Sequence, residues 1–352
     1  YMLREQYPSL PLEELPQLIR SIHSALDFQK VFIYPLMKKL LAGATTGFSF
    51  DHDALADKRQ PYTFISNHRD IVLDAALLDI ALIEAQFPNT VQIAIGDNLF
   101  AYPWIEKLAR LNKSFVVRRG IGLRETLLAS KKLSAYMHHC IEVQKHSIWI
   151  AQREGRAKDG NDRTQEAVLK MIAMSSEATP LESLKAMHIV PLAISYEYDP
   201  CDYLKAKEFQ QRRDNPAFKK TREDDVLSMR TGIFGYKGQV HYAAAPCINE
   251  WIDELSELPT KEFFTAVAQH IDTAIFTHFK AFAVNHIAAD LLQGSEARTE
   301  HYTTEEKNHF IAYLHSRIDK IEVENKDEAF LFSKLIEMYA NPLLNKEGVE
   351  RC

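Results

Sequence analysis

The segment YTFISNHRDIVLDAALLDIALIEA, at residues 62–85, decides the fold. It opens with a short apolar run that is typical of a buried strand. A polar turn follows at residues 67–70, and the apolar run from Ile71 to Ala85 then predicts a helix. A buried strand, a short turn and a helix make the first half of a βαβ unit. The segment therefore predicts a sheet with parallel strands.

The same pattern recurs along the chain. A helix is expected at residues 123–144, and short apolar runs predict strands at residues 91–95, 114–117, 147–151, 189–196 and 239–243. Residues 9–42 and those after Pro259 have helical spacing instead. We therefore expect an α/β fold with a mostly parallel mixed sheet flanked by helices. The expected division is an N-terminal helical segment at 1–55, an α/β domain at 56–258 and a C-terminal helical segment at 259–352.

Composition excludes several classes of protein. The formal net charge of −6 over 352 residues gives no basic excess, so nucleic acid is not an expected partner. The four cysteines lack a C-x-x-C spacing, which argues against a zinc site or a disulfide framework and favours a reducing compartment. No uncharged apolar run approaches the ~18–20 residues that span a bilayer.

Polar blocks follow the first four predicted strands, and Gly96-Asp97-Asn98 is the block after residues 91–95. His68 comes after the first, Arg118 and Arg119 follow residues 114–117, and Glu154-Gly155-Arg156 follows residues 147–151. Ligands of open α/β sheets bind outside the carboxyl ends of the strands, where these blocks would meet. Each block alone is commonplace, since a histidine near an acid or a pair of arginines is usually solvated. Their occurrence in order on successive strands indicates a site.

These blocks resemble the motifs of the glycerophospholipid acyltransferase family. The resemblance rests on Asn67-His68 with Asp74, on FVVRR at residues 115–119, on EGR at 154–156 and on VPLA at 190–193, and it covers roughly residues 60–250. GDNL at 96–99, followed by Pro103, is most similar to the glycerol-3-phosphate branch. The resemblance implies a catalytic α/β domain. Such a domain transfers a fatty acyl group from a thioester to a hydroxyl of a glycerol phosphate or lysophospholipid.

The sequence also departs from the family pattern. Five residues separate His68 from Asp74 where the family has four, Arg153 stands where the family has proline, and no Thr or Ser separates Gly155 from Arg156. These departures leave the substrate open. They also leave open a non-catalytic relative that binds phospholipid or acyl carrier protein, and a His/Asp thioesterase that uses water as the acceptor.

The chemistry of acyl transfer defines the role expected for His68. A base must take the proton of the attacking hydroxyl, and imidazole suits this task because its unperturbed pKa is about 6.5. A carboxylate on the other ring nitrogen fixes the tautomer. We expect Asp74 to be this partner, while Asp70 remains an alternative and is a natural helix cap. The start of the helix after His68 is expected to supply backbone donors for the oxyanion.

The resemblance also implies how substrates bind. The phosphate of the acceptor would be held by Arg118, Arg119 and Arg156, because guanidinium forms paired hydrogen bonds with phosphate oxygens. Lys158 is a weaker candidate for the same role. Glu154 would orient an arginine or contact glycerol hydroxyls, and Gly155 would permit a tight turn. The acyl donor would be acyl-CoA or acyl carrier protein. No resident cofactor and no metal are expected.

Three further segments have two interpretations each. The basic residues of 205–222 form either a solvated loop or a contact for anionic lipid or an acidic carrier protein over the site. Residues 28–42 form a helix that packs on the domain or lies on a membrane. The phenylalanines after residue 260 belong to the core, to an acyl tunnel or to a membrane-docking face. The resemblance implies a cytoplasmic protein, peripheral on the inner face of the membrane.

Overall fold

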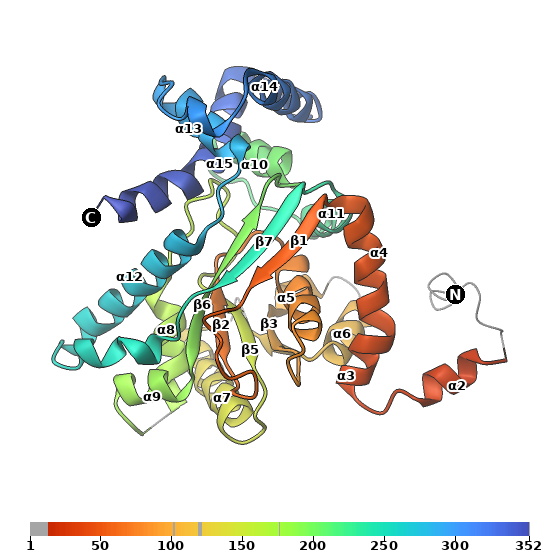
Figure 1. Ribbon diagram of the computed structural model, residues 1–352, viewed down its shortest axis with the longest axis vertical. Helices are drawn as coiled ribbons and strands as arrows, with labels where there is room; N and C mark the ends of the chain where they lie inside the picture. Colours follow the sequence, from red (N-terminus) through yellow and green to blue (C-terminus); the bar gives the residue numbers. More distant parts are fainter. Residues whose placement is uncertain (1–12, 101–102, 119–121, 176, 352) are drawn as a thin grey trace.

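The computed structural model describes residues 13–100, 103–118, 122–175 and 177–351. Within these residues, seven strands form one sheet in the order β1-β7-β6-β2-β5-β3-β4 (Figure 1). The strands are β1 Gly47–Asp51, β2 Thr63–Ser66, β3 Gln92–Gly96, β4 Ser114–Val117, β5 Ile148–Ala151, β6 Ile189–Tyr196 and β7 Gln239–Ala244. The six strands expected from the sequence are confirmed to within a residue at each end.

The sheet is mixed but mostly parallel. β6 and β7 pair antiparallel, and the other neighbours pair parallel. The predicted fold class is therefore confirmed. β2 lies between β5 and β6, so the polar turn that follows β2 lies at the middle of one edge of the sheet. We call this edge the carboxyl edge.

β1 was not expected. It is the outermost strand beside β7, and its residues alternate between exposed and half-buried. The sheet therefore begins before the boundary that the sequence pattern placed at residue 56. The division of the chain into three segments stays a prediction.

Helices cover both faces of the sheet. α4 (Tyr34–Ala44) and α5 (Leu73–Glu84) lie on one face, and α7 (Leu123–Glu142), α8 (Glu166–Ile172), α9 (Pro180–Ala186) and α12 (Thr260–His278) lie on the other (Figure 1). Alternation along β2 divides its side chains between the two cores, with Phe64 packed on the α5 side and Ile65 on the α12 side. Since every residue of β2 is buried, both faces of this strand need apolar side chains.

Four helical elements precede the sheet, and the last of them, α4, packs on the domain. They are α2 (Leu15–Arg20), α3 (Ala25–Phe28), a π-helical turn η1 (Gln29–Ile33) and α4. Met37 and Leu41 of α4 are buried in the core that contains α5, and Lys38 binds Glu84 at 2.7 Å. Packing on the domain is therefore confirmed for α4, whose Met37 and Leu41 are buried.

A third core forms where several helices gather at the carboxyl edge, at the top of Figure 1. These helices are α10 (Asp202–Asp214), α13 (Ala283–Gln293), α14 (Thr304–Asp319) and α15 (Glu328–Glu350), while α11 (Arg222–Phe234) follows α10. The phenylalanines expected in the C-terminal segment are buried, which favours the core interpretation: Phe263, Phe264, Phe276, Phe279 and Phe282.

Candidate active site

His68 and Asp74 form a hydrogen-bonded pair at the centre of the carboxyl edge. β2 ends at Ser66, a loop carries His68, and Asp74 is the second residue of α5. Nδ1 of His68 lies 2.8 Å from Oδ2 of Asp74. The expected partnership of His68 with Asp74 is therefore confirmed, and Asp70 is not the partner.

Asp74 is held in place from several directions. Its Oδ2 also accepts the N–H of Arg69 at 2.8 Å, and its Oδ1 accepts the N–H of Asp70 at 3.0 Å. The Tyr242 hydroxyl donates to its backbone carbonyl at 3.1 Å. Because an ionised carboxylate only accepts hydrogen bonds, neutral His68 must carry its proton on Nδ1. Nε2 is then the basic nitrogen.

Asp70 caps the helix instead. Its Oδ1 accepts the N–H groups of Val72 and Leu73, each at 2.8 Å. Burial, and then the charge of Asp74, raises the pKa of Asp70. The two aspartates thus already accept the backbone N–H groups of Arg69, Asp70, Val72 and Leu73. These N–H groups therefore do not supply the expected donors for the oxyanion.

The loop explains how the longer His–Asp interval is accommodated. Residues 67–72 are not helical, and α5 begins only at Leu73. On a continuous helix, Asp74 would lie about 120° away from His68 around the axis. Because His68 precedes the helix, its ring folds back onto the first turn and reaches Asp74. The extra residue is therefore compatible with the hydrogen bond.

His68 faces a cavity of about 290 Å³ at the carboxyl edge. Ile71 and Leu99 also line this cavity, together with the loop after β5 and parts of α10 and α11. Six Lys or Arg and four Asp or Glu side chains are in the lining, so it has a basic excess of two charges. The basic residues are Arg153, Arg156, Lys158, Lys205, Lys207 and Lys220.

The expected residues of the loop after β5 reach the cavity. Glu154, Gly155 and Arg156 all line it. Gly155 has φ +70°, a left-handed conformation that favours glycine, so the tight turn is confirmed. Nη1 of Arg156 is buried and has no hydrogen-bond partner among the described residues. The guanidinium is therefore not fully used by the protein itself.

Arg118 lies apart from this cavity. It is exposed and is not among the described residues that line the cavity. It follows β4, the edge strand, which is three strands from β2. At roughly 4.8 Å per strand, the two strand ends are about 14 Å apart. Arg118 therefore does not line the cavity that His68 and Arg156 line, and Arg119 lies outside the described residues.

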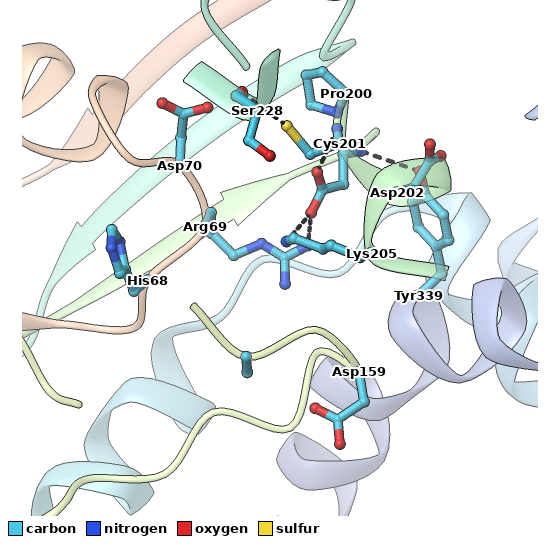
Figure 2. A network of polar contacts seen from close by, with 12 residues as sticks. His68, Arg69, Asp70, Asp159, Pro200, Cys201, Asp202, Lys205, Ser228 and Tyr339 are labelled. Carbon is cyan, nitrogen blue, oxygen red and sulfur yellow. Dashed lines mark hydrogen bonds and ion pairs between the residues drawn. The ribbon is translucent and has the colours of Figure 1, made fainter. Parts of the chain in front are cut away.

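Basic residues that the family motifs do not contain come from α10 and from the loop that joins it to α11. The run at residues 205–222 was the signal, and its interpretation as a segment over the site is supported because Lys205, Lys207 and Lys220 line the cavity. Figure 2 shows Arg69 extending toward Lys205 below Cys201. Lys205 binds Asp199 at 2.6 Å, and Asp199 also lies 3.8 Å from Arg69. Although burial raises the pKa of Asp199, the charges of Lys205 and Arg69 lower it to about 2.

Asp162 joins the two loops of the site and was not expected. Its Oδ2 accepts the N–H of His68 and its Oδ1 accepts the N–H of Ala157, each at 3.3 Å. Arg153 lies 3.7 Å from the same carboxylate. Burial raises the pKa of Asp162, and the charges of Arg69, His68 and Arg153 oppose this shift. No spacing in the sequence indicates a contact between residues so far apart.

Lys158 and Lys220 also bind acidic residues. Glu208 of α10 lies 2.7 Å from Lys158 and 3.7 Å from Lys220. Part of the basic charge at this end of the cavity is thus neutralised. Among the residues that the structure describes, no group of three or more His, Cys, Asp or Glu side chains is placed to hold a metal ion.

Comparison with known proteins agrees with this geometry. Residues 50–195 match the family model described as Acyltransferase. This stretch contains His68, Asp74, Arg118, the 154–156 loop and nearly all of β6. It is an acyltransferase domain of the glycerophospholipid acyltransferase family, as the motifs indicated. A search of curated proteins gave no match.

The match to this stretch supports an acyltransferase enzyme and suggests acyl transfer in lipid metabolism. In the part of the chain that the structure describes, no helix combines the length and apolarity needed to span a membrane.

Proposed function

We propose that the protein moves a fatty acyl group from an acyl thioester, either acyl-CoA or acyl carrier protein, to a hydroxyl of a glycerol phosphate or lysophospholipid-type acceptor. The observation that carries this proposal is the 2.8 Å hydrogen bond between His68 and Asp74 at a cavity with a basic excess. The family match to residues 50–195 supports acyl transfer as the reaction.

The proposed reaction uses Nε2 of His68 as the base. The acceptor hydroxyl gives its proton to Nε2 as its oxygen attacks the thioester carbonyl, and Asp74 stabilises the imidazolium that forms. The tetrahedral intermediate then collapses with cleavage of the carbon–sulfur bond. The departing thiolate takes the proton from His68, so an ester and a free thiol are the products. No nucleophile from the protein is needed.

The basic lining supports an acceptor that carries a phosphate. Arg156 lies in the same cavity as His68, with one Nη not used by the described residues. Guanidinium forms paired hydrogen bonds with phosphate oxygens, so Arg156 is the proposed phosphate ligand. Lys207 lines the same cavity and is the proposed second cation. In this proposal Glu154 orients the arginine or contacts the glycerol, as the resemblance implies.

A thioesterase would need only water beside His68. The cationic lining of the cavity favours an anionic acceptor over water, because water needs no phosphate site. A non-catalytic relative is disfavoured by the intact contact between His68 and Asp74, since a protein that only binds lipid has no need of an oriented imidazole. We also propose that the enzyme works as a peripheral protein on the cytoplasmic face of the membrane, where lipid acceptors and products reside.

The experiment that tests this function supplies either donor, acyl-CoA or acyl carrier protein, with each acceptor alone, with a mixed acceptor pool and with none. Mass spectrometry then identifies the products. We expect an acylated phosphate-bearing product only when acceptor is present. Release of free fatty acid at the same rate without acceptor would establish a thioesterase. Binding of acceptor without any product, for both donors, would establish a non-catalytic relative.

A further inference from the structure

The β4 side of the carboxyl edge carries exposed apolar side chains on two helices. α6 (Pro103–Leu111) follows β3, and α7 follows β4, so both helices start next to neighbouring strand ends at this edge. Trp104 on α6 is 62% exposed, and Leu127 and Leu128 on α7 are 58% and 54% exposed. Large apolar side chains so fully in water indicate a surface that another structure covers.

Five consecutive residues in the first turns of α7 are exposed. They run from Arg124 to Leu128. A helix that packs on its own domain normally turns an apolar stripe toward the core, and α7 does this only farther along, where Met137, Cys140 and Ile141 are buried. The exposure of Leu127 and Leu128 is therefore not accounted for by packing within the described residues.

The same region is strongly basic. Residues 103–132 contain eight Lys or Arg and two Asp or Glu, a net charge of +6 in a chain whose net charge is −6. On a helix, positions 124, 127, 128 and 131 share one face, so the two leucines of α7 lie between Arg124 and Lys131. On α6, Lys107 lies one turn from Trp104 in the same way. Apolar and basic side chains thus alternate on both helices.

We propose that Trp104, Lys107, Arg124, Leu127, Leu128 and Lys131 form a docking surface for an anionic phospholipid bilayer. Tryptophan and leucine enter the interface of a bilayer, and neighbouring lysine and arginine contact its acidic head groups. This inference rests on the proposed function, because it names the surface through which the enzyme would bind the membrane. Leu99, which follows β3 just before α6, lines the cavity. Docking here would hold the cavity next to the lipid phase.

An acidic protein partner is the competing explanation of the charge. A bilayer explains the exposed apolar side chains better than an acidic protein does. These side chains come from two separate helices that flank the edge strand, and they include an amphipathic tryptophan. The helix α4, the other basic helix considered for a membrane, is buried through Met37 and Leu41. Its exposed lysines, Lys30 and Lys39 on η1 and α4, offer a matched charge control.

The test measures co-sedimentation of the full chain with phosphatidylcholine vesicles, with and without phosphatidylglycerol, in the absence of substrates. We expect binding to the anionic vesicles, weakened by salt, with a blue shift of tryptophan emission. Trp149 is buried and Trp251 partly buried, so the shift reports on Trp104. The pair Leu127→Ser and Leu128→Ser should weaken binding by about tenfold or more. Val143→Ser, 66% exposed at the other end of α7, should not.

The charge variants complete the design. Lys107→Glu with Lys131→Glu should weaken binding to anionic vesicles several-fold, while Lys30→Glu with Lys39→Glu should leave it close to wild type. Equal effects of the two pairs, unchanged binding by the leucine variant, or binding to acidic carrier protein without binding to vesicles would each overturn the proposal. Because no substrate is present, these results do not depend on whether acyl transfer occurs. The leucine variant should still turn over water-soluble substrates at the wild-type rate.

Discussion

Oδ2 of Asp74 lies 2.8 Å from Nδ1 of His68 and also accepts the N–H of Arg69, so one oxygen contacts both the histidine ring and the loop that carries it. The loop and the imidazole are thus fixed by the same buried group. Asp70, four residues earlier, accepts hydrogen bonds from the backbone at the start of α5 instead. Two buried aspartates of one short segment therefore have separable functions.

Asp74→Asn should abolish most activity. The amide nitrogen cannot accept the Nδ1 proton, so His68 loses the tautomer that leaves Nε2 basic. We expect turnover to fall by about 10²–10⁴-fold, the range that general acid–base catalysis contributes. Steady-state kinetics at saturating donor measures this effect.

Asp70→Asn is the matched control for that change. Asparagine caps a helix as well as aspartate does, so both activity and thermal stability should stay close to wild type. A loss of turnover as large as that of Asp74→Asn would contradict the assignment of separate functions to the two residues.

Arg156→Lys should raise the KM for the phosphate-bearing acceptor. Lysine keeps the charge but cannot form the paired hydrogen bonds, and a charge-assisted hydrogen bond contributes about 1.5–3 kcal/mol. The expected increase is roughly tenfold or more, with less change in the KM of the donor. Arg118→Lys is the control and should leave the acceptor KM unchanged, because Arg118 does not line the cavity. Similar increases in both variants would show that the phosphate site extends to β4.

Gly232→Ala should destabilise the protein. A Cβ at this position of α11 would overlap the carboxylate of Asp70, so α11 or the loop must shift. Overpacking of this kind costs about 1–3 kcal/mol. Gly348→Ala on α15, where nothing lies within 4 Å of the added carbon, should instead be neutral or stabilising by up to about 1 kcal/mol. Thermal unfolding followed by circular dichroism separates the two, and an equal melting temperature would contradict the close approach of α11 to Asp70.

Lys205→Met should lower the free energy of unfolding at neutral pH more than at acidic pH. The pKa of Asp199, about 2 in the folded protein, lies below its unfolded value, so its ionised form stabilises the fold above pH ~4. That contribution is lost as the pH falls toward 2. Without Lys205 the buried carboxylate of Asp199 loses its close partner, which should lower the free energy of unfolding by about 3–5 kcal/mol near pH 7.

The difference between Lys205→Met and wild type should shrink below pH ~4, because protonation removes the charge that needs a partner. Urea unfolding at pH 7 and pH 3 measures it. Lys207→Met, on the same helix and also lining the cavity, should cost little at either pH. A pH-independent difference for Lys205→Met would contradict the ion pair as its cause.

Much of the fold was predictable because its sheet is buried on both faces. Strands such as β6, with every residue buried, stand out as apolar runs. β1 did not stand out because it is an edge strand in which exposed and half-buried residues alternate and no residue is fully buried. The hydrogen bond of His68 to Asp74 was predictable because a carboxylate inside an apolar run requires a partner.

The arrangement of the basic residues was less predictable. The order of the motifs along the chain does not reveal the order of the strands in the sheet. The sequence therefore does not show that Arg118 follows the edge strand while Arg156 follows a strand next to the centre. Contacts such as Asp162 with the N–H of His68 join residues that are far apart in the chain. The basic run at residues 205–222 indicated a segment over the site, and the tertiary fold shows which of its side chains line the cavity: Lys205, Lys207 and Lys220.

The most direct test of the account is the rate of acyl transfer to a phosphate-bearing acceptor by His68→Ala, compared with His139→Ala. His139 is exposed on α7 and serves as the matched control. We predict that His68→Ala loses about 10²–10⁴-fold in turnover while keeping the wild-type melting temperature, and that His139→Ala is unaffected. A His68→Ala protein that forms the acylated product at the wild-type rate would contradict the assignment of His68 as the base.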